Sequence, residues 1–321
     1  MTSVTSNAAN KIDPAAYVTV KKKKKKKLSL FDVINNSLLI LLTLLCLYPL
    51  YYTLIASVSD FTAVATGKVS FWPINFQLKA YQAVFENSQI WTGYRNTIIY
   101  TVAGTAFNLF LTIPAAYVMS KKQMLGHSII TWYFLITMYF GGGMIPTYLL
   151  YKDLGLLDNP LVMIVTGGLS IYNMVVARTY FSSSIPGDLY EAGRIDGCSE
   201  FGLFFKIALP LAMPIIAVLT LYYAVGHWNS YFSAMMYLTK QSYQPLSLVL
   251  RRILIMNQSA VDEAGLMTLD PALLQDAAAR ANLAIVMKYA LVLIASAPML
   301  ILYPFIQKYF VKGVMIGALK G

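Results

Sequence analysis

The chain has 321 residues, of which 58% are hydrophobic and only 12% are charged. A soluble domain carries about 25% charged residues, so this composition excludes an ordinary soluble enzyme. Its high hydrophobicity excludes a disordered chain, and two cysteines exclude a disulfide scaffold. The composition instead predicts an all-α integral membrane protein with several spans.

Residues 1–32 form a predicted basic cytoplasmic tail. The lysine run Lys21–Lys27 supplies most of the formal net charge of +11. Such a run binds phosphate backbones, but it also anchors a cytoplasmic terminus beside a membrane. Because an apolar stretch begins at Val33, we favour the anchor. A membrane protein whose lysine run binds nucleic acid or anionic lipid is an alternative hypothesis.

Six stretches of 18 or more residues contain no Asp, Glu, Lys or Arg, and a membrane helix needs about 20 apolar residues. They are Val33–Ser59, Asn96–Ser120, Gln123–Tyr151, Asn159–Ala177, Ile207–Thr239 and Tyr289–Gln307. Open sheet edges do not occur in lipid. We therefore predict six transmembrane helices over residues 33–308.

The positions of Lys and Arg predict the orientation, because these residues accumulate in cytoplasmic loops. With the N-terminus inside, the inside segments carry 16 of them and the outside segments carry 9. Both termini are then cytoplasmic, including a tail over residues 309–321. Residues 60–95 and 240–288 become external loops, and residues 184–206 become a cytoplasmic segment.

The sequence shows no sign of enzyme chemistry. Its single Gly-Lys pair, Gly67-Lys68, lacks the other residues of a phosphate-binding loop, and its few histidines and cysteines form no metal cluster. No acidic or basic residue lies inside a predicted span, where ion-coupled carriers usually keep one. We predict a chain that is not an enzyme and binds no metal or cofactor itself.

The most informative segment is residues 184–214, here called the motif loop. Ser184 and Pro186 suit the start of a first helix, and Gly197 suits a left-handed turn after it. That helix carries an apolar stripe at helical spacing, formed by Leu189, Ala192 and Ile195. The pattern predicts helix, turn and second helix, leading into the fifth span.

The motif loop resembles the cytoplasmic motif of the permeases of binding-protein-dependent ABC importers. The motif appears here as Glu191-Ala192-Gly193, then Gly197, then Ile207-Ala208-Leu209-Pro210. Further residues resemble the carbohydrate-uptake branch of this family, of the maltose/oligosaccharide type. They are Asp196, Phe204, Pro214, Tyr48-Pro49 and residues 309–317. The likeness covers roughly residues 30–321.

This resemblance implies a type I ABC importer fold and a division of labour. The expected partners are a second related permease, two cytoplasmic ATPase subunits that hold ATP-Mg, an extracytoplasmic sugar-binding protein and membrane lipid, with no nucleic acid. The chain itself would form half of a pathway for an oligosaccharide or glycan fragment through the bacterial cytoplasmic membrane.

The resemblance also implies which residues couple the chain to the ATPase: Glu191, Ala192, Gly193, Asp196, Gly197, Phe204, Leu209 and Pro210. Glu191 is expected to make a charged contact, Asp196 and Gly197 to set the turn, and Leu209-Pro210 to join the loop to the fifth span. Gly193 replaces an alanine of the family motif and is expected to cost its helix up to about 1 kcal/mol.

The fifth span holds the residues expected to line the substrate pathway: Tyr223, His227, Trp228, Asn229 and Tyr231. Polar side chains within a span face either a cavity or another helix, so helix packing with an aromatic belt is the competing interpretation. Asn108, Asn173 and the hinge candidate Gly141-Gly142-Gly143 have the same two interpretations.

A six-helix channel or secondary carrier without an ATPase is the alternative function. It would predict an intramembrane charge or a selectivity-filter sequence, and the sequence shows neither.

Overall fold

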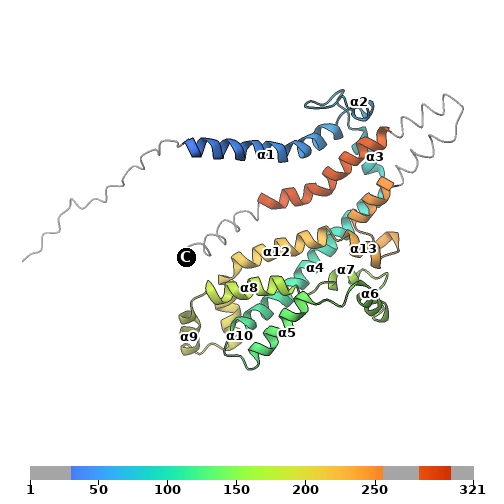
Figure 1. The fold of residues 1–321 in the computed structure, drawn as a ribbon. Helices are drawn as coiled ribbons and strands as arrows, with labels where there is room; N and C mark the ends of the chain where they lie inside the picture. The colour runs from blue at the N-terminus through green and yellow to red at the C-terminus, as the bar shows by residue number, and fades with distance from the viewer. Residues whose placement is uncertain (1–29, 256–281, 305–321) are drawn as a thin grey trace, which may run out of the picture. The chain divides into compact units, whose positions relative to one another are not determined.

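The computed structural model describes residues 30–255 and 282–304, and every regular element in these ranges is helical (Figure 1). The predicted basic tail up to residue 29, residues 256–281 of the second predicted external loop, and residues 305–321 lie outside the described ranges. The chain divides into two compact units, Met1–Pro49 and Leu50–Gly321.

The helices in chain order are α1 (Leu30–Ser57), α2 (Phe61–Ala65), α3 (Lys79–Glu86), α4 (Ser88–Ser120), α5 (His127–Tyr139), α6 (Met144–Asp153), α7 (Leu161–Val165), α8 (Ile171–Ser183), α9 (Gly187–Ile195), α10 (Glu200–Gly202), the π-helix η1 (Leu203–Ala208), α11 (Leu209–Leu211), α12 (Met213–Trp228), α13 (Tyr231–Tyr237) and the 3₁₀-helix η2 (Gln241–Tyr243). Residues 246–255 and Asn282–Pro304 are also helical.

Three helices of the described ranges are long and apolar enough to cross a membrane: α1, α4 and Asn282–Pro304. Two bent pairs raise the number to five if each is one span. These are α5 with α6, bent by 108°, and Glu200–Leu211 with α12, bent by 76°. The predicted all-helical membrane class is thus observed, while the six spans and the orientation of the termini stay predictions.

Glycines lie where the apolar stretches break. The bend between α5 and α6 falls at Gly141–Gly143, and Gly143 has a φ of +87°. Gly167, with a φ of +69°, lies between α7 and α8. Both angles are in the left-handed region that glycine adopts readily. A break exposes backbone groups that need hydrogen-bond partners within a membrane.

Helix α4 supplies such partners from a buried polar face. The Nδ2 of Asn108 donates to the carbonyls of Gly167 and Gly168, at 3.0 and 2.8 Å. The Nδ2 of Asn96 donates to the carbonyl of Ser242, in η2, at 2.7 Å. α4 therefore stabilises the broken segments beside it.

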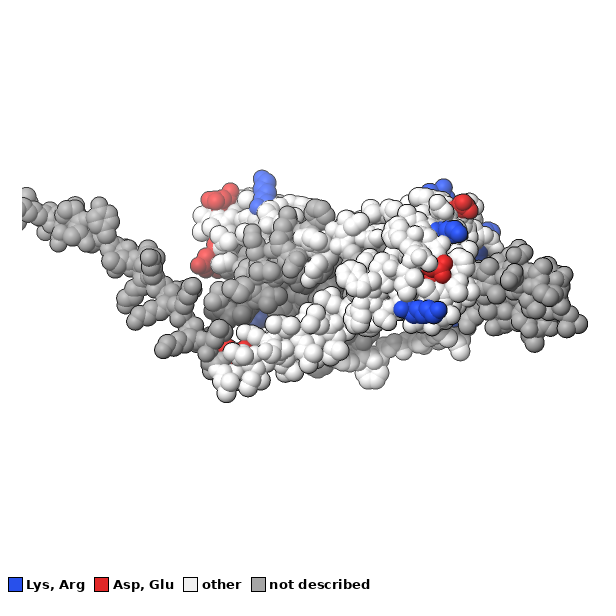
Figure 2. Space-filling model, turned by 90° about the horizontal axis from the view of Figure 1, so that it is seen from above, with Lys and Arg blue, Asp and Glu red and all other residues white. Residues whose placement is uncertain are grey.

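Charged side chains lie apart from the apolar middle of these helices. α12 carries no Lys, Arg, Asp or Glu, and α4 carries only Arg95. On the face drawn in Figure 2, the blue and red side chains gather in two groups with white surface between them. This distribution is expected where the middle zone lies in lipid.

Candidate functional site

Helix α9 of the motif loop has two different faces. Tyr190 and Gly193 are buried. The predicted apolar stripe lies on the opposite, exposed side, with Ile195 86% exposed. Residues 30–255 and 282–304 thus leave this stripe uncovered, which is typical of a partner-binding surface.

The turn after α9 has the predicted form, but the start of the helix differs. Asp196 is the C-cap, and Gly197 follows with a φ of +77°, in the left-handed region. The N-cap is Pro186. Ser184 was expected at the start of α9, but α8 extends to Ser183, so Ser184 is the C-cap of that helix instead.

Charged residues surround the exposed side of α9. The Nη2 of Arg194 lies 2.8 Å from the Oε1 of Glu200, and this hydrogen bond raises the pKa of Arg194. Glu191 is exposed. Together with Lys121 and Lys122 it lines an open cavity of about 310 Å³ beside the end of α4. The motif loop therefore combines an apolar stripe with charges of both signs.

Gly193 lies against η1. A Cβ at this position would stand 2.6 Å from the Cδ2 of Leu203 and 2.8 Å from the Cδ1 of Ile207. The missing side chain lets α9 and η1 approach closely. Glycine lowers the stability of α9 as a helix, but it also allows closer packing of α9 against η1. The sequence pattern did not predict this packing.

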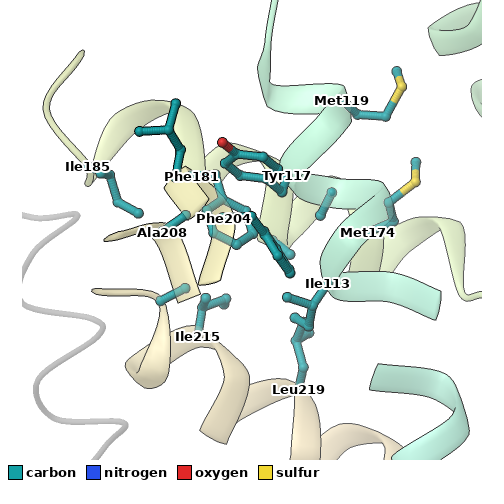
Figure 3. Close-up of a cluster of buried hydrophobic side chains, with 14 of the residues drawn as sticks. Ile113, Tyr117, Met119, Met174, Phe181, Ile185, Phe204, Ala208, Ile215 and Leu219 are labelled. Carbon is teal, nitrogen blue, oxygen red and sulfur yellow. The ribbon is translucent and has the colours of Figure 1, made fainter. Parts of the chain in front are cut away.

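Four buried rings join the motif loop to the spans: Tyr117 of α4, Phe181 of α8, Tyr190 of α9 and Phe204 of η1. The Tyr117 ring centroid lies 5.7, 6.1 and 5.0 Å from those of Phe181, Tyr190 and Phe204, respectively, within the range of favourable ring pairs. Figure 3 shows Tyr117, Phe181 and Phe204 within this cluster. Phe204 thus anchors the motif loop from its buried side.

Lys121, directly after α4, contacts the same rings. Its Nζ lies 3.2 Å from the centroid of the Tyr190 ring and 4.7 Å from that of Tyr117, which are cation–π distances. Burial lowers the pKa of Lys121 and raises the pKa of Tyr190 to about 12. Sequence reasoning missed this contact, although Tyr117 and Lys121 are spaced four residues apart.

A second cavity, of about 310 Å³, lies where α12 passes α4 and the break between α7 and α8. Tyr223, His227 and Asn229 line it. The Nε2 of His227 lies 2.6 Å from the Oδ1 of Asn108. A Cβ on Gly104 would stand 2.3 Å from the His227 ring, so the imidazole fits because that position is glycine.

The other two predicted pathway residues lie elsewhere. Trp228 lines a separate cavity of about 440 Å³, and its Nε1 donates to the carbonyl of Ala295 at 3.0 Å. The hydroxyl of Tyr231 contacts the Sδ of Met235 at 2.8 Å. The structure thus brings three of the five predicted residues to one cavity.

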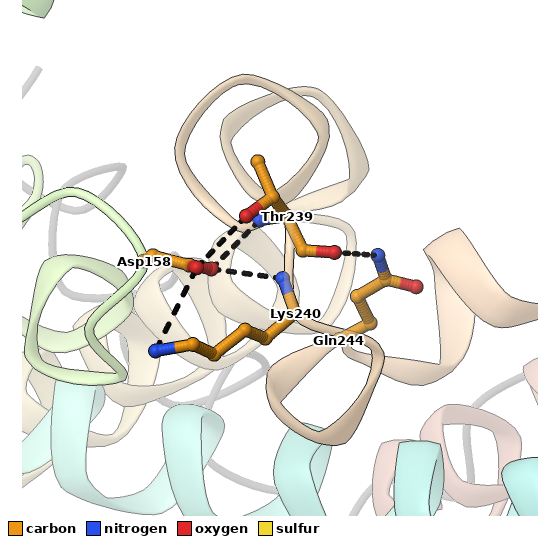
Figure 4. Close-up of polar contacts among 4 residues, drawn as sticks. All are labelled: Asp158, Thr239, Lys240 and Gln244. Atoms are coloured by element: carbon orange, nitrogen blue, oxygen red, sulfur yellow. Dashed lines mark hydrogen bonds and ion pairs between the residues drawn. The ribbon is translucent and has the colours of Figure 1, made fainter.

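A polar contact that sequence reasoning missed joins the segment between α6 and α7 to the one after α13. The Asp158 carboxylate accepts hydrogen bonds from the backbone N–H groups of Thr239 and Lys240 at 2.9 and 2.8 Å, and from the Thr239 hydroxyl at 2.8 Å (Figure 4). These bonds, that of Lys240 foremost, lower the pKa of Asp158. We call these three residues the Asp158 latch.

The described residues contain no group of three or more His, Cys, Asp or Glu side chains placed to hold a metal ion. Hydroxyl, amide, imidazole and aromatic groups line the cavity at His227, whereas the cavity at Trp228 is lined mainly by aliphatic side chains.

Comparison with known proteins matches residues 90–316 to the family model of the binding-protein-dependent transport system inner membrane component. The chain is 35% identical to the polygalacturonan/rhamnogalacturonan transport system permease protein YtcP of Bacillus subtilis (strain 168), over 91% of this chain and 99% of that protein. It is also 35% identical to Protein LplC of the same strain, over 91% and 95% of the two chains.

Among solved structures, the chain is similar to that of a bacterial ABC transporter involved in the import of the acidic polysaccharide alginate. The TM-score is 0.76 and the identity 32%, over 87% of this chain and 96% of that one. The family resemblance inferred from the motif loop is confirmed.

Proposed function

The chain belongs to the family of binding-protein-dependent transport system inner membrane components, and from this premise we propose that it forms half of a pathway for an oligosaccharide or glycan fragment and couples to a cytoplasmic ATPase through its motif loop. It is a permease subunit of the bacterial cytoplasmic membrane with the fold of type I ABC importers, and it has no catalytic activity of its own. The predicted family, location and non-enzymatic role are confirmed.

The observation that carries the proposed coupling is the uncovered outer side of the motif loop. Ile195 of α9 and Phe201 of α10 are 86% and 78% exposed, and Glu191, four residues before Ile195 on α9, is also exposed. Exposed apolar surface rimmed by charge marks a site for a protein partner. An importer permease needs an ATPase partner at its cytoplasmic side, and this surface offers both apolar area and charge to it.

Five of the eight predicted coupling residues take the expected roles in this proposal. Glu191 contributes the charged contact, and Asp196 and Gly197 shape the turn that presents α9. Leu209 and Pro210, in α11, connect η1 to α12 across the 76° bend. A displacement of the motif loop would thereby reach the helix that lines the cavity.

The cavity beside α12 supports a sugar as the substrate. Tyr222 and Tyr223 supply rings and hydroxyls, and His227 and Asn229 supply polar groups. Hydroxyl, amide and imidazole groups predominate among the residues that line this cavity, and placed polar groups of this kind fix the orientation of a small-molecule ligand. The similar proteins are named for polygalacturonan/rhamnogalacturonan and for alginate, so we propose a fragment of a polysaccharide.

The proposed assembly contains a second permease, two ATPase subunits carrying ATP-Mg and an extracytoplasmic sugar-binding protein. A tagged chain, solubilised gently from native membranes, should retain the ATPase and the second permease, as identified by mass spectrometry. Recovery of the chain alone would favour the channel or carrier instead.

The contact itself is tested by reversing one charge. Glu191→Lys should lower the amount of co-purified ATPase about tenfold, as expected for a lost charged contact of about 1.4 kcal/mol, with unchanged thermal stability. The matched control is Glu86→Lys, which reverses a charge that is also exposed, on α3. If Glu191→Lys retains as much ATPase as Glu86→Lys, the assigned role of Glu191 is wrong.

A further inference from the structure

We propose that Lys121 is a positioning residue of the motif loop, because its ammonium, lying against the rings of Tyr117 and Tyr190, sets the position of α9 relative to α4. This inference rests on the proposed function, in which α9 receives the movement of the ATPase. It names a contact through which that movement reaches α4, the helix that stabilises the broken segments around the cavity.

Lys121 links two separate elements. Tyr117 belongs to α4 and Tyr190 to α9, and their ring centroids are 6.1 Å apart. The ammonium is closer to the ring of α9, at 3.2 Å, than to the ring of its own helix, at 4.7 Å. Lys121 is also held to α4, since its backbone N–H donates to the carbonyl of Val118 at 3.1 Å. The side chain therefore bridges from the end of α4 to α9.

The tyrosine rings, and not their hydroxyls, make this contact. The Oη atoms of Tyr117 and Tyr190 are buried, and neither has a hydrogen-bond partner among the described residues. A cation over an aromatic face is attracted by the ring quadrupole, more strongly where water is excluded. Phenylalanine at position 190 should therefore preserve the link, whereas an aliphatic residue should not.

Helix α9 depends on such contacts for its position. It has nine residues, and a helix of this length is not stable by itself in water. Gly193 ties it to η1, which leads into α12. Lys121 ties it to α4. The neighbouring charges Lys122, Glu191 and Arg194 line the same open cavity, where solvent screens them.

The test measures the distance between α9 and α4 in the purified complex with its ATPase. Native Cys46 and Cys198 are replaced by alanine, and spin labels are placed at the exposed positions Val102 of α4 and Asp188, which lies in the first turn of α9 and outside its apolar stripe. Double electron–electron resonance should show one narrow distance. Lys121→Gln should lower the ratio of this docked population to displaced ones about fivefold, the change expected for one cation–π contact.

Matched variants separate the contact from a general loss of structure. Lys122→Gln, Lys121→Arg and Tyr190→Phe should all keep the narrow distance, while Tyr190→Leu should broaden it as Lys121→Gln does. If Lys121→Gln does not fold, the comparison of Tyr190→Phe with Tyr190→Leu still tests whether the aromatic ring holds α9 in place. The inference is wrong if Lys121→Gln matches Lys122→Gln, or if Tyr190→Phe broadens the distance as much as Tyr190→Leu.

Co-purification of the ATPase keeps the two proposals apart. A wild-type chain that retains no ATPase overturns the proposed function. An ATPase that is retained by the wild type and by Lys121→Gln, with no change in the distance, overturns the role of Lys121 alone.

Discussion

The motif loop and the Asp158 latch are held by different kinds of interaction, buried aromatic packing in the first and partly exposed hydrogen bonds in the second. The motif loop is held by buried rings, among which Phe204 contacts Tyr117 from another helix. The latch is held by one carboxylate whose side chain is 26% exposed. A ring removed from a buried cluster leaves a cavity, whereas water can replace a hydrogen bond at the surface. Burial, more than the number of contacts, should therefore decide which region is more sensitive to mutation.

The largest effect is expected inside the ring cluster. Phe204→Ala removes a ring that is 9% exposed and should lower the free energy of unfolding by about 3 kcal/mol through lost contacts and a cavity. Phe205→Ala is the matched control, since that ring is 59% exposed. Thermal unfolding in detergent, followed by tryptophan fluorescence, measures both. Equal losses for the two variants would contradict a motif loop held by its buried rings.

A smaller effect is expected at the latch, and it depends on pH. Asp158→Asn removes the negative charge of the carboxylate that accepts hydrogen bonds from the backbone N–H groups of Thr239 and Lys240. The melting temperature at pH 7 should therefore fall, but by less than in Phe204→Ala. The control is Asp153→Asn, at the exposed end of α6, which should change the melting temperature less.

The sign of the pH dependence follows from the lowered pKa of Asp158. A carboxyl whose pKa is lower in the folded state stabilises the fold fully above its ordinary pKa and loses this contribution as pH falls through the folded value. The difference between the wild type and Asp158→Asn should therefore be full at pH 7 and shrink below about pH 4. A difference that stays constant into acid would show that the charge of Asp158 is not what holds the latch.

The helical membrane class could be predicted because it depends on composition and local pattern. Boundaries were less predictable. α4 begins at Ser88, before the predicted Asn96, because the single charge of Arg95 is tolerated near a helix end. The stretch Asn159–Ala177 contains α7 and only the first part of α8, which ends at Ser183, since counting charges does not detect a backbone break at Gly167.

In the motif loop, too, the features that depend on local sequence spacing could be predicted, and those that depend on tertiary contacts could not. The apolar stripe and the left-handed turn at Gly197 follow from local spacing, and both are observed. That the stripe is exposed, and that Tyr190 faces inward, depends on which helices pack beside α9. The Asp158 latch joins residues 81 positions apart, and no local pattern in the sequence reports such a pairing.

The smallest effect is expected for the ion pair that joins α9 to α10. Arg194 and Glu200 have side chains that are 45% and 63% exposed, so solvent screens their attraction and ordering them has an entropic cost. Glu200→Gln should shift the melting temperature by less than about 1 °C, and raising the salt concentration should leave the wild type equally stable. A shift as large as that of Phe204→Ala would reverse the comparison, because the motif loop would then depend on a surface charge pair and not on its buried rings.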